Sequence, residues 1–113
     1  MKREYILLAM FQAMDCLYDE QENPSEELLQ FVSDANPYMY VDRTAVDPAV
    51  QADFDSSMAR QNIGEEVDEQ TAYYAVKNFL NEQNPQFAEM FADITLGEWQ
   101  KLCAIIAEEE GAN

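Results

Sequence analysis

Residues 2–20 read KREYILLAMFQAMDCLYDE, and their hydrophobic pattern decides the fold class. Apolar side chains recur at steps of three and four residues, the spacing that places them on one face of an α-helix. The centre of this stripe is Ile6, Met10, Ala13, Met14 and Leu17, and Leu7, Phe11 and Tyr18 widen it. A stripe this wide predicts a central helix that other elements cover on two sides.

An Asn or Asp followed by proline recurs three times further along the chain. Such a pair is typical of a helix start, because the Asx side chain accepts backbone N–H groups and proline fits the first helical position. The pairs are Asn23-Pro24, Asp47-Pro48 and Asn84-Pro85. They predict helices that bury Leu28, Phe31 and Val32, then Val50, Phe54 and Met58, and then Phe87 and Phe91. The first two should stop near residues 36–37 and 62–64.

Two more helices complete the pattern. Residues 66–82 carry apolar side chains at helical spacing, and the last helix starts at Thr95-Leu96-Gly97-Glu98, which fits a capping box. Trp99, Leu102, Cys103 and Ile106 follow on one face, and Gly111 offers a stop. Since no segment alternates with period two for long, we predict an all-α fold. It is an irregular bundle of five to six short helices in one domain, residues 1–113.

The charges at the chain ends indicate how the first and last helices pack. Lys2 and Arg3 lie at the positive end of the first helix dipole, and residues 108–110, all Glu, lie at the negative end of the last. Antiparallel packing of these helices would make the opposite charges neighbours. In that arrangement Cys16 lies opposite about residue 96, too far from Cys103 for a disulfide. Both thiols fall in apolar helical patterns and are expected to be buried.

The charge balance narrows the classes of partner. Twenty-three acids against six bases give a formal charge of −17. Nucleic acids and anionic membrane surfaces are disfavoured, because both need clustered Lys and Arg. A basic protein surface, a cationic ligand or divalent cations would be attracted. The alternative is that the charge only keeps a small protein in solution.

The apolar run at residues 5–11, YILLAMF, is too short for a membrane span and continues at helical spacing, unlike a secretory signal. Two cysteines are too few for a disulfide scaffold. We therefore expect a cytoplasmic protein, either a monomer or a weak homodimer.

The chain lacks the residues that most catalytic mechanisms need. There is no histidine, which removes the commonest general base, and the three glycines are too far apart for a phosphate-binding loop. Paired carboxylates remain as a catalytic option, but they would need a concave pocket that separates their pKa values. The sequence predicts no enzyme and no cofactor.

Residues 94–99, ITLGEW, are similar to the closing half of an EF-hand loop. Counting back from Glu98, however, places Phe87 and Phe91 at ligand positions and Ala92 where the loop needs glycine. The capping box accounts for Thr95 and Glu98 without a metal. We therefore predict no metal site.

Two segments are candidates for partner binding. The densest acidic cluster is Asp19, Glu20, Glu22, Glu26 and Glu27. It could dock a basic partner with fast, salt-sensitive association, or it could be a solvated loop with helix-start acids. The second candidate is the aromatic loop with Tyr38 and Tyr40, since exposed aromatic residues are frequent in interfaces. Its side chains could equally cover the core.

The hypothesis that follows is a non-enzymatic interaction module that binds a basic protein. Small acidic helical proteins include immunity proteins, inhibitors of basic nucleases and nucleic-acid mimics, a comparison that composition alone supports. The alternative is a structural or self-associating protein in which an exposed apolar patch matters more than the acids.

Overall fold

The computed structural model describes residues 1–111, and within them the chain forms six helices. These are α1 (Glu4–Glu20), α2 (Glu26–Ala35), α3 (Pro48–Arg60), α4 (Glu69–Gln83), α5 (Pro85–Phe91) and α6 (Leu96–Gly111). An isolated bridge pairs Lys2 with Glu66, and the described residues contain no longer strand. The all-α prediction is confirmed.

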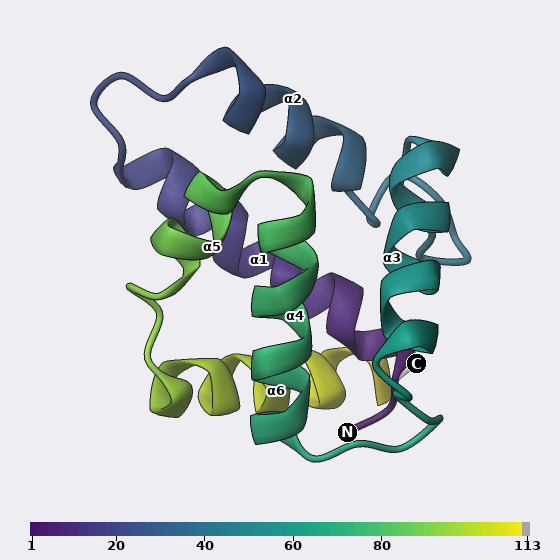
Figure 1. Ribbon diagram of the computed structural model, residues 1–113. Coiled ribbons are helices and arrows are strands. Elements are labelled where there is room, and N and C mark those ends of the chain that lie inside the picture. The colour runs from purple at the N-terminus through teal and green to yellow at the C-terminus, as the bar shows by residue number, and fades with distance from the viewer. Residues whose placement is uncertain (112–113) are drawn as a thin grey trace.

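Helix α1 is the central element of the bundle. It packs against α2, α4, α5 and α6, and every residue from Tyr5 to Met10 is buried. Figure 1 shows α1 running from right to left through the molecule while α6 runs from left to right below it. The first and last helices therefore pack against each other in opposite senses, as the sequence predicts.

The helix starts follow local capping chemistry. Asp47 accepts a hydrogen bond from the Ala49 amide at 2.8 Å, and Asn84 accepts one from the Gln86 amide at 3.0 Å. The prediction for Asn23-Pro24 is wrong, because α2 begins two residues later. There Ser25 Oγ accepts from the Leu28 amide at 3.1 Å.

Helix α4 also starts later than predicted, at Glu69 and not at residue 66. The Asp68 side chain accepts a hydrogen bond from the Thr71 amide at 2.7 Å and so forms the N-cap. Residues 65–67 pair with the N-terminal segment instead, through a bond from the Arg3 amide to the Glu65 carbonyl at 2.9 Å. That pairing holds these residues outside the helix.

Two groups of aromatic rings fill the interior. Tyr73, Phe91 and Trp99 form one, with ring centroids 5.1 to 6.2 Å apart. Phe31, Phe54, Phe79 and Phe87 form the other, between α2, α3, α4 and α5. Trp99 is fully buried and donates its indole N–H to the Glu69 carbonyl at 2.9 Å. This bond ties α6 to the start of α4.

The charged chain ends make different contacts from those predicted. Glu110 pairs with Arg43, whose Nε lies 3.0 Å from Oε1. Arg3 donates to the carbonyls of Ile63 at 3.1 Å and Asp55 at 3.4 Å. Lys2, Arg3 and Glu110 still line the same hollow. The start of α1 and the end of α6 are therefore close together, but the ion pair with Glu110 is formed by Arg43, which lies in the loop after α2.

Both cysteines are free, as predicted. Cys103 is buried, whereas the prediction that Cys16 is buried is wrong, because its side chain is exposed. The C-terminal half of α1 is covered on one side only, so Cys16 falls outside its buried stripe.

The capping box that opens α6 is present as predicted. Glu98 accepts from the Thr95 amide at 3.1 Å, and Thr95 Oγ1 accepts from the Glu98 amide at 3.1 Å. Thr95→Ala is therefore expected to lower the free energy of unfolding by about 1 kcal/mol at pH 7, measured by urea denaturation.

The same box adds a pH dependence. Hydrogen bonds from the backbone and side chain of Thr95 hold the pKa of Glu98 below its usual value of 4.5. Because the bound form is the carboxylate, its contribution is present above that value and is lost as the pH falls through the lowered pKa. We expect wild type to be more stable than Glu98→Gln at pH 7 and to lose that advantage in acid. An advantage that grows in acid would contradict this.

Candidate functional site

The acidic cluster of residues 19–27 is exposed to solvent in the structure. Asp19, Glu20, Glu22, Glu26 and Glu27 all have exposed side chains. They lie at the end of α1, in the connection to α2 and in the first turn of α2. Within residues 1–111 none of the five forms an ion pair with a Lys or Arg side chain. Their negative charge is therefore not neutralised by the chain itself.

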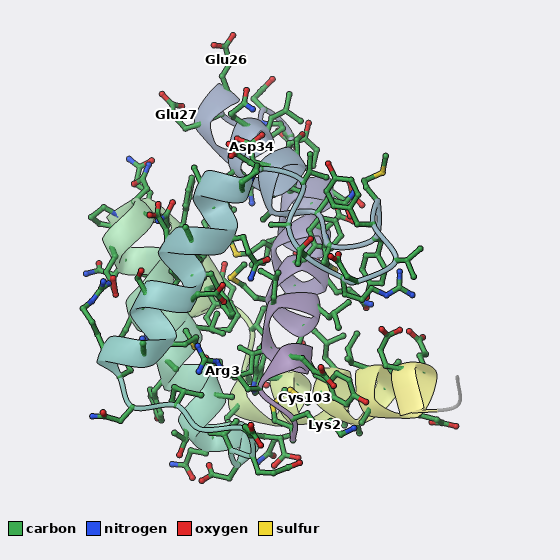
Figure 2. The ribbon with its side chains drawn as sticks, turned by 90° about the vertical axis from the view of Figure 1, so that its right-hand side faces the viewer. Lys2, Arg3, Glu26, Glu27, Asp34 and Cys103 are labelled. Atoms are coloured by element: carbon green, nitrogen blue, oxygen red, sulfur yellow. The ribbon has the colours of Figure 1, made fainter. Side chains whose placement is uncertain are left out.

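Two members of this cluster, Glu26 and Glu27, also line a groove of about 490 Å³. The groove lies between α2, the start of α3 and the junction of α4 with α5. Figure 2 shows Glu26 and Glu27 projecting outward from the first turn of α2, at the opposite end of the molecule from Lys2 and Arg3. Asp34 lies further along α2, near the top of α3. We call this feature the acidic groove; its lining is Glu26, Glu27, Gln30, Phe31, Asp34, Val50, Gln83, Asn84 and Phe87.

The floor of the acidic groove is apolar and well packed. The exposed fractions of Phe31, Val50 and Phe87 are only 7%, 8% and 5%. These three residues come from three different helices. The rings of Phe31 and Phe87 lie 5.0 Å apart at their centroids, and Phe31 also contacts Phe79. Since the floor is part of the main core, its shape is fixed by the fold.

The rim of the acidic groove carries only carboxylates and amides. No Lys or Arg side chain lines it in the described part of the chain. Gln30 donates to Asp34 Oδ1 at 2.9 Å, Gln83 donates to Asp53 Oδ2 at 3.2 Å, and Asn84 caps α5. The amides thus satisfy neighbouring groups, while Glu26 and Glu27 point their charges into solvent.

Tyr38 and Tyr40 have different environments. Tyr38 is half-buried: its ring packs on Phe11 with centroids 5.8 Å apart, and its hydroxyl oxygen accepts from Gln12 Nε2 at 2.5 Å. The Arg43 guanidinium carbon lies over the same ring, 5.1 Å from its centroid. Burial is the main reason that the pKa of Tyr38 is raised. Tyr40 is exposed, as are Met39 and Val41 beside it.

The acidic cluster and the aromatic loop do not form one surface. The cluster precedes and opens α2, whereas the loop follows its last residue, Ala35, so the helix separates them (Figure 1). The ten residues of α2 therefore keep the two candidate segments apart.

A second, larger hollow of about 1110 Å³ opens near the N-terminus. Three of the six bases line it, namely Lys2, Arg3 and Arg43, together with six acids. Its strongest charged contacts are internal: Arg43 pairs with Glu110, and Arg3 donates to backbone carbonyls. These contacts join α1, α3, α6 and the loop, so the hollow is a structural junction.

The thiols have raised pKa values, and the carboxylates of residues 1–111 form no metal-binding group. Burial raises the pKa of Cys103 to about 12, and burial followed by the Glu20 carboxylate raises the pKa of Cys16, so the surroundings of both thiols disfavour the thiolate. Within residues 1–111 no group of three or more Cys, Asp or Glu side chains could hold a metal ion. The buried Ser57 hydroxyl donates to Glu82 at 2.8 Å and links α3 to α4.

Gln30 and Asp34 line the groove but are not among the site residues predicted from the sequence. A signal for them exists, since Glu27, Gln30 and Asp34 are spaced at i, i+3 and i+7 and share one helix face. What cannot be read from that spacing is the floor, because Val50 and Phe87 come from distant parts of the chain.

No helix within residues 1–111 is long and apolar enough to cross a membrane. The chain matches no protein-family model, no curated protein and no solved structure.

Proposed function

We propose that this chain is a non-enzymatic interaction module whose acidic surface binds a basic partner protein. The observation that carries the proposal is the uncompensated charge of Asp19, Glu20, Glu22, Glu26 and Glu27, which are exposed and unpaired with any base in residues 1–111. Two of them sit on a helix anchored in the core through Leu28 and Phe31. Fixed carboxylates of one sign steer and select a partner of the opposite sign.

The narrower form of the proposal is an inhibitor, an immunity protein or a nucleic-acid mimic. In each of these a rigid acidic face covers the basic site of another protein, and no chemistry of its own is needed. Free thiols fit a reducing, cytoplasmic location. A net charge of −17 favours a monomer or a weak dimer over a tight self-assembly.

The test is capture of partners by the tagged chain from its native host lysate, at about 50 mM and about 500 mM NaCl. We expect a basic protein that is retained at the lower salt only. Neutralising all five acids to Gln or Asn should weaken its binding about tenfold, because the steering charge is lost.

A matched control neutralises five exposed acids elsewhere and should change binding less than about twofold. These acids are Glu4, Asp55, Glu65, Asp93 and Glu108. Equal losses in the two variants would show that only the bulk charge matters, which would contradict the placement of the binding surface. Capture of no basic protein at low salt would overturn the proposal.

One observation favours the alternative of a self-associating protein. At the tip of the aromatic loop, Met39 is 69% exposed and Val41 is fully exposed. If this tip is a contact between copies, dimers should form, resist high salt and disappear in a Met39→Ser, Val41→Ser variant, as measured by analytical ultracentrifugation.

A further inference from the structure

The acidic groove has the construction of a side-chain pocket with a charged rim. Its floor of Phe31, Val50 and Phe87 offers apolar contact, and these residues are held by the core and not by a loop. An apolar side chain that enters the groove would remove the remaining exposure of the floor from water. The floor therefore selects a partner with at least one apolar anchor.

The rim sets the spacing of the partner's charges. Glu27 and Asp34 are seven residues apart on one face of α2, which corresponds to about 10 Å along the helix axis. Two Lys or Arg side chains at positions i and i+7 of a second helix have the same separation. An apolar side chain at i+4 of that helix would then lie between them, above the floor.

The sign of the charge excludes the other occupants. A second copy of the chain also carries −17 and would be repelled by the rim. Nucleic acids and anionic membranes are repelled for the same reason. What the rim attracts is a cationic polypeptide, since carboxylates form charge-assisted hydrogen bonds with Arg and Lys.

From these three features we infer that the acidic groove binds a short basic amphipathic helix of a partner protein, with one apolar side chain on the floor between two Lys or Arg residues. This inference rests on the proposed function and adds the form of the partner to it. It corresponds to the recognition mode in which a helix lies in a groove of a folded domain.

The probe is a stabilised helical peptide with Arg at i and i+7 and Leu at i+4, titrated into the whole chain by isothermal titration calorimetry at about 50 mM NaCl. The control is the same peptide with Ser in place of Leu. It keeps the charge but lacks the apolar side chain, and it should bind about tenfold more weakly. In two-dimensional NMR spectra the resonances of Phe31, Val50 and Phe87 should shift on binding of the Leu peptide.

Two variants of the chain locate the contact. Gln30→Lys places a base on the rim and should weaken the Leu peptide about tenfold. Gln100→Lys makes the same change on the exposed side of α6 and should weaken it less than about twofold. Circular dichroism of both variants confirms that the fold is retained.

The outcomes separate this inference from the proposed function. If the two Lys variants weaken the peptide equally, or if the Leu and Ser peptides bind equally well, the groove is not the binding site. The proposed function would then still be supported by salt-sensitive capture of a basic protein. The opposite result is that no basic protein is captured, while the Leu peptide binds the wild-type chain and is weakened by Gln30→Lys. That result would support the groove as a binding site and overturn the proposal that the wider acidic surface binds a basic protein.

Discussion

Replacing Trp99 with alanine is expected to lower the free energy of unfolding by about 4 kcal/mol. The indole is fully buried, packs against Tyr73 and Phe91, and donates a 2.9 Å hydrogen bond to the Glu69 carbonyl. Truncation leaves a large cavity between α4, α5 and α6 and leaves that carbonyl without its indole donor. Because a domain of this size is stable by about 5–15 kcal/mol, the loss is a large fraction of the total.

The measurement is urea denaturation followed by far-ultraviolet circular dichroism, since the substitution removes the only tryptophan. Tyr74→Ala is the control: Tyr74 neighbours Tyr73 on α4, but its side chain is 51% exposed. It should cost less than about 1 kcal/mol. A similar loss in the two variants would mean that Trp99 does not organise the core as the structure indicates.

Where the sequence predicts helix starts well, the deciding interaction is local. Asp47, Asn84 and Thr95 each accept or exchange hydrogen bonds within three residues, so their roles follow from the order of residues alone. The start at Asn23 is wrong because Ser25, two positions later, is an equally good cap. Both Asn23 and Ser25 could cap the helix by local hydrogen bonding, and in the structure Ser25 is the N-cap.

Burial could be predicted only where the covering elements are implied by the pattern itself. The wide stripe of α1 correctly indicates a central helix. Cys16 is exposed because nothing covers that side of the last turns of α1, and this depends on where α2 and α5 lie. The partner of Glu110 was missed for a similar reason, because Arg43 stands 67 positions earlier in the chain.

The candidate site likewise has a part that the sequence predicts and a part that depends on the tertiary fold. The exposure of Glu26 and Glu27 follows from their place in the first turn of a helix, where acids also favour the dipole. The groove beside them needs Val50 from α3 and Phe87 from α5, which only the tertiary fold brings to α2. The positions of the acids in the sequence thus predict only that the partner is basic. The fold adds the apolar floor, which predicts that the partner also carries an apolar side chain.

Arg3 shows how a residue that is unfavourable in its own helix can be stabilising in the fold. It stands at the N-cap of α1, the positive end of that helix dipole. Its guanidinium reaches the middle of α3 and the segment after that helix, where it donates to the carbonyls of Asp55 and Ile63. These hydrogen bonds to one carbonyl within α3 and one just after it offset the small penalty in α1.

We therefore expect Arg3→Ala to lower the free energy of unfolding by about 2 kcal/mol, because a charged donor and its two acceptors are separated. The neighbouring Lys2→Ala removes an equal charge, but Lys2 is exposed and its nearest carboxylate, on Glu4, is 4.0 Å away. That control should cost less than about 0.5 kcal/mol. Equal losses in urea denaturation would mean that bulk charge, and not the contact with α3, accounts for the effect. Removing either base from a chain with six bases and 23 acids adds about the same net repulsion, so the difference between the two variants reports mainly the hydrogen bonds of Arg3.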